Sequence, residues 1–530
     1  MKHRRWFRIR AAVQVCCWLS FVAILVATRD PIGDGYLYGI FPRLSLHLGI
    51  ATSLASRQFL SAFLPALAIL ALSLGIGRFF CSTVCPLGAS IDACDRIVAR
   101  RKDGIKSETA RSWRGLKYLT LAGSLLLSLA GVQAAGIIDP LSLSLRAYST
   151  LVYPFFDHTI KLLFDGLISI PVLGAAVAPL YGLMADTVLD FNAIYFYNTG
   201  GVLVLLLSVL FLSMSTRRFW CRYLCPLGAL LALAGGFGMF RRTVDSSRCI
   251  NCLRCERDCR MGAIHNRGLA TLHGECVQCF ECLESCEYDA ISFRFVPPFG
   301  LAQPKTPPAE ASIITAAPEK PAISRRSLLA GTAASVALIP AFGLNAARRA
   351  DFSEIIRPPG SLPEDRFLDA CIRCGACMKA CPTNALHPAF LESGLEAIYT
   401  PRLIPRIGWC EKNCVLCTEV CPTGAIRKLR IGDKETTVIG TAYFLKDLCI
   451  PWSEGRECIV CEEVCPTVTK SIKFREETVL NKKGESVRVK LPYVLEDICI
   501  GCGICENKCP VRGSAAIRVR TRKSEIPAAG

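Results

Sequence analysis

Cysteine spacing constrains this chain more strongly than any other feature of its sequence. Most of its 31 cysteines fall into six groups of four, and in four of these groups the cysteines are separated by two, two and three residues. Three thiolates spaced in this way wrap one loop around an iron–sulfur cubane, while the fourth, often followed by proline, serves a neighbouring cluster. The pattern predicts up to six [4Fe–4S] clusters. The quartets are Cys249, Cys252, Cys255 and Cys259; Cys276, Cys279, Cys282 and Cys286; Cys371, Cys374, Cys377 and Cys381; Cys410, Cys414, Cys417 and Cys421; Cys449, Cys458, Cys461 and Cys465; and Cys499, Cys502, Cys505 and Cys509.

Several quartets depart from the regular spacing, and the spacing does not decide how the C-terminal quartets pair. Arg260 and Glu287 replace the expected proline after the first two quartets, the fourth quartet opens with a three-residue gap, and the fifth opens with an eight-residue gap after Cys449. We expect Cys259 to complete the second site and Cys286 to complete the first. The four C-terminal quartets pair either as neighbours or in a nested order. A Cys₄ zinc site is the alternative, but zinc favours two C-x-x-C pairs separated by a long loop.

Four apolar runs predict a helical membrane domain. Hydrophobic residues make up 52% of the chain, and its mean hydropathy is +0.36. The runs are about 11–28, 58–77, 116–138 and 200–215. Basic residues cluster in the N-terminal tail, in 78–117 and in 216–222, and the positive-inside rule places these segments in the cytoplasm. The same bias accounts for the net charge of +18 without a nucleic-acid partner, for which no motif is present.

A fifth apolar stretch, 160–183, tests this topology. The third run should end outside and the fourth should begin outside, so an even number of crossings lies between them. The stretch also contains Lys161, Asp165 and Pro171. We therefore interpret it as an external interfacial or re-entrant segment.

An internal repeat joins two of the apolar runs to a second cysteine pattern. Residues 78–89 read RFFCSTVCPLGA, and residues 218–229 read RFWCRYLCPLGA. Two pseudo-symmetric halves would present four thiols to one another. One hypothesis is that these thiols form a metal or redox centre beside a quinone site. The other is that proline and glycine only turn the chain and the thiols only pack. These candidates are Cys81, Cys85, Cys221 and Cys225. The isolated cysteines Cys16, Cys17 and Cys94 are interpreted as packing residues.

The composition predicts six segments along the chain. They are a transmembrane domain with two C-x-x-x-C-P motifs (1–240), a two-cluster α+β ferredoxin-like domain (241–296), a Pro/Ala-rich linker (297–323), a twin-arginine-like segment and membrane anchor (324–345), a four-cluster ferredoxin-like domain (346–520) and a tail (521–530). Arg325 and Arg326 before a modestly apolar run resemble an export signal; an ordinary anchor with basic residues inside is the alternative.

These motifs resemble a known pair of proteins. With its two R-F-x-C-x-x-x-C-P-L-G-A motifs and the two quartets that follow, 1–290 resembles the NapH/MauN ferredoxin-type membrane proteins. With its arginine pair and four quartets, 324–515 resembles the NapG/MauM ferredoxin-type proteins. The chain thus looks like a fusion of the two. The resemblance implies quinol oxidation at a bacterial inner membrane and electron delivery to a periplasmic reductase or cytochrome c.

The functional hypothesis is therefore membrane-bound electron transfer. The two-cluster domain would be cytoplasmic and the four-cluster domain periplasmic. The sequence has six histidines and no C-x-x-C-H, Ser/His/Asp pattern, P-loop or dinucleotide fingerprint, so we predict neither haem nor separate catalytic residues. An electron carrier or quinol dehydrogenase subunit is favoured over a stand-alone enzyme. An assembly or regulatory factor and a subunit of a larger oxidoreductase are the alternatives.

Overall fold

The computed structural model describes residues 4–28, 35–98, 113–190, 194–296, 331–333, 336–337, 355–391, 394–480 and 484–521. It divides into two compact units. The first comprises 1–24, 40–145 and 201–340; the second comprises 25–39, 146–200 and 341–530. Most of the predicted linker and twin-arginine segment lies outside the described residues.

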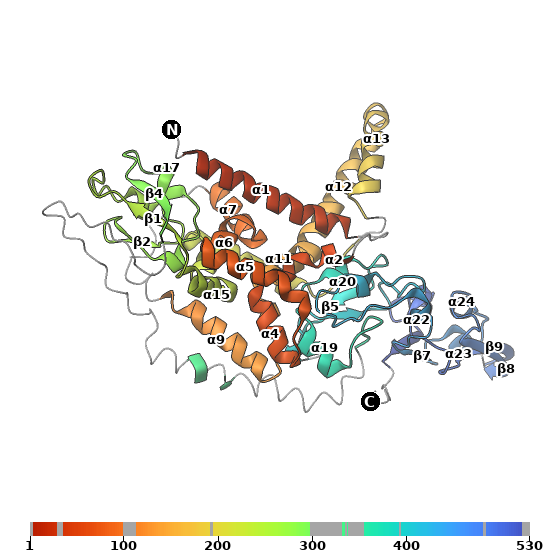
Figure 1. Cartoon of the computed structure of the whole chain (residues 1–530). Coiled ribbons are helices and arrows are strands. Elements are labelled where there is room, and N and C mark those ends of the chain that lie inside the picture. Colours follow the sequence, from red (N-terminus) through yellow and green to blue (C-terminus); the bar gives the residue numbers. More distant parts are fainter. Residues whose placement is uncertain are drawn as a thin grey trace. The chain divides into compact units, whose positions relative to one another are not determined.

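The first unit is built mainly from apolar helices (Figure 1). Its longer helices are α1 (Arg4–Ala27), α4 (Leu46–Ser56), α5 (Leu64–Gly75), α9 (Leu116–Leu129) and α14 (Gly200–Ser215). Within the described residues, only α1 is long and apolar enough to cross a membrane by length and composition. Helices α5, α9 and α14 lie within the other three predicted spans, and α4 precedes the second span. All four are shorter than a membrane-spanning helix needs to be, so the four-span domain stays a prediction.

Polar side chains inside this helical unit are paired with one another. Ser45 caps α4 by accepting a hydrogen bond from the backbone N–H of Leu48, and its hydroxyl donates to Asp139 at 2.6 Å. His47 contacts the same carboxylate at 3.2 Å, and both side chains are fully buried. Asp139 also accepts a hydrogen bond from the backbone N–H of Leu141 at the start of the next helix. Burial is tolerated here because each polar group has a partner.

The sequence repeat is also a structural repeat. After α5 come the short helix α6 (Phe79–Thr83) and α7 (Pro86–Val98). After α14 come the π-helical turn η3 (Trp220–Leu224) and α15 (Pro226–Gly235). The second cysteine of each motif directly precedes a proline at the first position of a helix, where its fixed φ and missing N–H are tolerated. In each motif, therefore, a short helical turn ends just before the second cysteine and a new helix begins directly after it.

A small α+β segment completes the first unit. Strand β1 (Phe240–Val244) pairs antiparallel with β4 (Ile291–Phe295), so Phe240 lies opposite Phe295. A second ribbon pairs β2 (Ile264–His265) with β3 (Ala270–Thr271). The one-turn helices α16 (Arg254–Arg257) and α17 (Glu281–Glu284) lie between β1 and β4 in the chain. The two quartets thus fall inside one strand pair.

In the second unit, the apolar stretch 160–183 forms parts of two helices instead of one segment. Helix α12 (Tyr153–Ile168) is followed after two residues by α13 (Pro171–Thr187), and the two lie side by side in Figure 1. Phe164 and Tyr181 pack between them with ring centroids 5.3 Å apart. Pro171 stands at the first position of α13, where its fixed φ and missing N–H are accommodated. A two-helix hairpin is compatible with the even number of crossings that the predicted topology places between the third and fourth runs.

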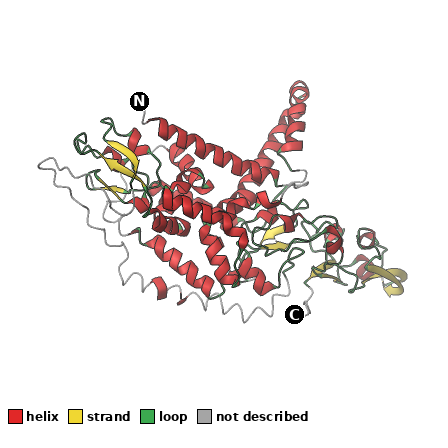
Figure 2. Cartoon of the chain, viewed as in Figure 1, coloured by secondary structure: helices red, strands yellow, loops and turns green. Residues whose placement is uncertain are grey.

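The rest of the second unit consists of short helices, loops and two-stranded ribbons (Figure 2). The ribbons pair β5 (Leu386–Pro388) with β6 (Pro401–Leu403), β7 (Thr441–Phe444) with β10 (Ile517–Arg520), and β8 (Ile472–Leu480) with β9 (Ser486–Val494). The short α-helices are α2 (Gly35–Tyr38), α19 (Glu364–Ala370), α20 (Ala376–Lys379), α21 (Leu416–Glu419), α22 (Ile431–Glu435), α23 (Ile450–Glu454), α24 (Val460–Glu463) and α25 (Ile504–Lys508). The β7–β10 pair encloses two quartets, as β1–β4 does in the first unit.

Candidate iron–sulfur centres

Two cavities in the first unit bring the first two quartets together in exchanged form. One is lined by the first three cysteines of quartet one and by Cys286, the last of quartet two. The other is lined by the first three cysteines of quartet two and by Cys259, the last of quartet one. This is the arrangement that the ferredoxin spacing predicts, in which each fourth cysteine crosses to the other site.

The second unit repeats this exchange between neighbouring quartets. Cys421 lines a cavity with the first three cysteines of quartet three, and Cys465 lines one with the first three of quartet six. Each of these four cavities is lined by four cysteines, which suits one kind of bound group.

Electrostatic interactions identify the two remaining groups of thiols. Cys417 interacts with the other early cysteines of quartet four and with Cys381 from quartet three. Cys461 interacts with Cys449 and Cys458 and with Cys509 from quartet six. Quartet three therefore pairs with four, and quartet five pairs with six. The nested order that the spacing left open is not the one the structure adopts, and Cys449 lies beside Cys458 despite the eight-residue gap.

Left-handed backbone conformations shape the cysteine loops. In the four quartets with regular spacing, a one-turn helix begins between the second and third cysteines. The residue just before that helix has a positive φ of 59° to 83°. These residues are Leu253, Phe280, Gly375 and Gly503. In quartets four and five the matching residues, Val415 and Ile459, have φ near −120°. The longer opening gaps of those two quartets thus go with a different loop path.

The donor chemistry of these sites fits a metal–sulfide group. Burial raises the pKa of Cys410 to about 11 and that of Cys502 to about 12, so the charge of a bare thiolate is disfavoured there. Burial also acts to raise the pKa of Cys465, but hydrogen bonds with Ser471 and Thr467 lower it. Positive metal centres would stabilise several thiolates held together in such a site.

The thiols of each cavity come in fours, as a cubane requires. In a cubane each thiolate binds a different iron. The four-cysteine linings of the cavities therefore fit [4Fe–4S] clusters.

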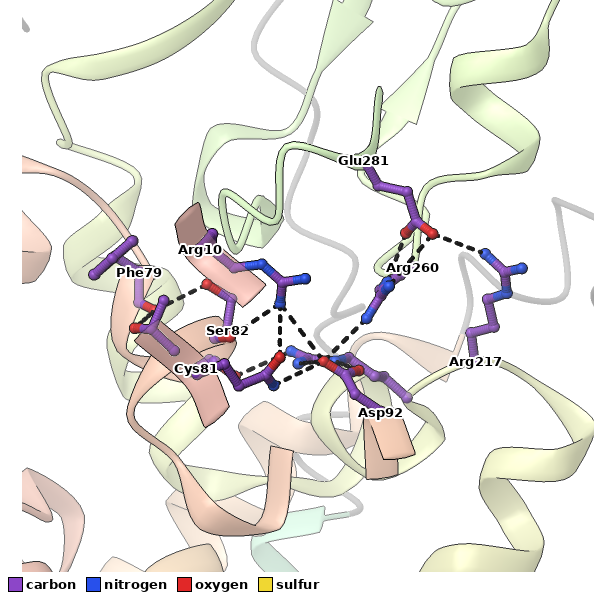
Figure 3. Close-up of polar contacts among 11 residues, drawn as sticks. Arg10, Phe79, Cys81, Ser82, Asp92, Arg217, Arg260 and Glu281 are labelled. Carbon is purple, nitrogen blue, oxygen red and sulfur yellow. Dashed lines mark hydrogen bonds and ion pairs between the residues drawn. The ribbon is translucent and has the colours of Figure 1, made fainter. Parts of the chain in front are cut away.

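A buried charge network lies between the first C-x-x-x-C-P motif and the first two quartets. Asp92 on α7 accepts two hydrogen bonds from Arg218, at 2.7 and 2.8 Å, and pairs with Arg260 at 3.0 Å. Arg260 continues to Glu281 at 2.6 Å, and Arg10 lies 3.7 Å from Asp92 (Figure 3). Although burial acts to raise it, these arginines hold the pKa of Asp92 well below its usual range. Sequence reasoning missed this network, because its members are far apart in the chain and follow no periodic pattern.

In the second unit, the segment 146–200 contacts the third quartet region. The buried ammonium of Lys379, on α20, pairs with Asp190 at 2.9 Å. The side chain of Asn384 donates to the backbone carbonyl of Tyr195 at 2.7 Å. Arg146 donates to the backbone carbonyl of Arg373 at 3.0 Å.

A second chain segment of this unit contacts the fourth quartet region. A Cβ atom at Gly35 would lie 2.7 Å from the carbonyl oxygen of Glu419 on α21. Two stretches that precede and follow predicted spans, 25–39 and 146–200, thus belong to the same compact unit as the C-terminal cysteine sites.

Two sequence families, both described as 4Fe-4S binding domain, match the chain. One matches 367–387 and 492–512, around the third and sixth quartets. The other matches 58–106 and 198–244, which contain the two C-x-x-x-C-P motifs. No solved structure matches.

Three curated relatives are similar to parts of the chain. The putative electron transport protein YccM of Escherichia coli is 24% identical over 258 residues, which are 47% of this chain and 61% of that protein. The ferredoxin-type protein NapG of Escherichia coli is 36% identical over 166 residues, 31% of this chain and 69% of that protein. The methylamine utilization ferredoxin-type protein MauM of Methylorubrum extorquens is 38% identical over 221 residues, 39% of this chain and 93% of that protein. Over about two fifths of its length, the chain therefore belongs to the MauM and NapG family of ferredoxin-type 4Fe–4S proteins.

Proposed function

We propose that this chain carries electrons from membrane quinol, through six [4Fe–4S] clusters, to a periplasmic reductase or cytochrome c. The observation that carries the proposal is the exchange of fourth cysteines between neighbouring quartets. Cys255 and Cys259 line different cavities although they are only four residues apart in the chain. Paired sites are therefore adjacent, as a relay requires.

The two pairs of sites in the second unit are also connected. The backbone N–H of Cys410 donates to the carbonyl of Cys502 at 2.8 Å, and the two thiols interact electrostatically. The four C-terminal sites thus form two adjacent pairs joined at this contact. Bound clusters would supply one-electron chemistry, with potentials set by hydrogen bonds, charge and exposure.

The sidedness that we propose for the four-cluster region rests on the predicted chain topology. If the predicted spans cross a membrane with their basic flanks inside, 25–39 and 146–200 lie outside. Both segments contact the cysteine-rich region of the second unit, through Gly35 and Glu419 and through Asp190 and Lys379. A soluble region in contact with external loops is itself external. This supports a periplasmic four-cluster region, a cytoplasmic two-cluster region, and an export or anchor role for 324–345.

We further propose that 1–290 is a NapH/MauN-type membrane part fused to the NapG/MauM-type region. The two matches at 58–106 and 198–244 support a duplicated membrane element, and the α6–α7 and η3–α15 repeats have corresponding chain order.

The direct test uses the full chain purified anaerobically in detergent or nanodiscs. We expect a quinol analogue to reduce the visible iron–sulfide absorption and then a soluble cytochrome c. Dithionite serves as a control that reduces accessible clusters without a quinol site. Reduction by dithionite but not by quinol would contradict the quinol assignment. Activity only with a tightly bound catalytic subunit would support the larger-oxidoreductase alternative, and loss of cofactor from a partner enzyme in a deletion strain would support the assembly alternative.

Sidedness has an independent test. A periplasm-active phosphatase reporter fused after Gly360 should be active, and a cytoplasm-active reporter at the same place should be silent. The matched pair of fusions after Gly104, in a predicted cytoplasmic segment, should give the opposite result. A silent phosphatase after Gly360 would refute the periplasmic assignment.

A further inference from the structure

Arg242 borders both candidate cluster sites of the first unit. These are site one, lined by Cys249, Cys252, Cys255 and Cys286, and site two, lined by Cys259, Cys276, Cys279 and Cys282. The side chain of Arg242 lines both cavities. It is 5% exposed, and Arg242 is the only buried residue of strand β1, where it lies opposite Phe293 of β4. One enclosed guanidinium is therefore beside both sites at once.

The guanidinium of Arg242 is held by neutral acceptors and by one cysteine of site one. Its Nη1 donates to Oγ1 of Thr271 at 3.0 Å. Its Nη2 donates to the backbone carbonyl of Gly268 at 2.9 Å and to the sulfur of Cys255 at 3.5 Å. Gly268 has a φ of 87°, and a Cβ atom there would lie 2.9 Å from the same sulfur. The loop can approach both groups because this residue has no side chain.

The charge of Arg242 has no counter-charge among the side chains around it. In the part of the chain that the structure describes, no carboxylate pairs with Arg242, and its buried Nε has no hydrogen-bond partner. Arg260 is different, because it pairs with Asp92 at 3.0 Å and with Glu281 at 2.6 Å. A buried charge is costly unless it is paired. Arg242 thus requires an anion that the side chains do not supply, and clusters ligated by thiolates would supply it.

The electrostatic influence of Arg242 reaches ligands of both sites. Burial raises the pKa of Cys255 in site one and that of Cys282 in site two, and Arg242 is the largest opposing influence in each case. Since such interactions weaken with distance, the guanidinium is close to sulfur atoms on both sides. Arg248 and Arg267 also line site one, but both are exposed, so water and salt screen their charges.

Site two lies in apolar surroundings that strengthen such an interaction. Cys259, Cys276 and Cys279 pack against one hydrophobic cluster of the first unit. That cluster also contains the four thiols of the C-x-x-x-C-P motifs, Cys81, Cys85, Cys221 and Cys225, each at most 8% exposed. A charge acts more strongly where little water is present to screen it.

We infer that Arg242 is an electrostatic bridge between the first two clusters, which stabilises the added electron on either of them. Reduction adds one electron to a cluster, and no bond forms or breaks. A fixed positive charge and a hydrogen bond to a ligand sulfur both favour the reduced form, so they raise the reduction potential. Because one guanidinium serves both sites, its removal should lower two potentials together. The inference rests on the proposed clusters in these two sites, but not on quinol, sidedness or the direction of electron flow.

The test is a redox titration of the full chain, purified anaerobically in detergent and followed by electron paramagnetic resonance. A hydrogen bond to a charged group changes an equilibrium constant by about tenfold. We therefore expect R242Q to lower the electron affinity of two clusters by about tenfold each, which is about 59 mV for a one-electron couple, at constant iron content. The matched control is R241Q, because Arg241 donates to the carbonyls of Gly238 and Gly236 and lines neither cavity.

A second variant covers the case in which R242Q does not retain its clusters. R242K keeps the positive charge but not the geometry of the guanidinium donors, so both potentials should fall by less than in R242Q. Unchanged potentials in the iron-loaded variants would overturn the inference, and so would a shift of one cluster only. A wild-type chain without iron and acid-labile sulfide would instead contradict the proposed clusters themselves, so the two failures are distinguishable.

Discussion

Replacing Asp92 by asparagine tests whether the buried charge network holds the first unit together. The carboxylate accepts a bidentate pair from Arg218, a bond from Gln14 at 2.9 Å and an ion pair from Arg260 at 3.0 Å. Asparagine has a similar size but is neutral, so it leaves Arg218 without its buried counter-charge and leaves Arg260 with Glu281 alone. Removing one partner of a buried ion pair costs about 3–5 kcal/mol.

The expected effect on melting follows from that magnitude. For domains of roughly 150–250 residues, 1 kcal/mol shifts the melting temperature by about 2–4 °C, so D92N should lower it by at least about 6 °C. The assay is loss of visible iron–sulfide absorption on heating at one fixed scan rate, because unfolding with cluster loss is irreversible. The matched control is D95N, one helical turn away on α7; no ion pair of Asp95 is recorded among the described residues, so this variant should not lower the melting temperature. Equal melting of D92N and wild type would refute the reasoning.

Three further predictions follow from other contacts. Burial raises the pKa of Asp95 to about 6, so the protonated carboxyl contributes stability that is complete below the pKa of Asp95 in the unfolded chain and is lost as pH rises through about 6. D95N should therefore flatten the dependence of melting temperature on pH in this range and melt slightly higher than wild type at pH 7. K379Q should leave Asp190 unpaired in the second unit and destabilise it by about 3 kcal/mol, which would appear as faster limited proteolysis within 146–200, while D190N with K379Q should recover part of the loss. S471A removes a hydrogen bond to the sulfur of Cys465, so the cluster held by Cys465 should have a lower reduction potential in a redox titration while the iron content stays constant; an unchanged potential would contradict the contact.

The sequence predicts those features that depend on local spacing. The ferredoxin quartets, the exchange of Cys259 and Cys286, and the duplication of the C-x-x-x-C-P motif are all readable because each is encoded within a few residues. The structure brings each of these groups together. Whether iron occupies them stays a prediction.

The features that the sequence does not reveal depend on contacts between distant segments. The pairing of quartet three with four rests on how their loops pack, and the same spacing is compatible with a nested order. The apolar stretch 160–183 reads as one segment because periodicity does not show that α12 and α13 fold back on each other. Arg218 donates a hydrogen bond to the backbone carbonyl of Cys81, 137 residues away, and an arginine in a basic segment reads as a topology signal rather than as a buried side chain.

The exchange of the last cysteine between neighbours has a consequence for how such a chain can be assembled or cut. A single quartet offers only three ligands to its own site, so neither site of a pair can be finished until both stretches of chain have been made. Deleting one quartet would disable two sites rather than one. Fragments that begin or end between Cys421 and Cys449 should load fully, whereas a boundary between Cys381 and Cys410 should leave two incomplete sites. The smallest unit of this region that can bind complete clusters is therefore a pair of quartets, so a duplication or deletion preserves complete sites only when it covers a whole pair.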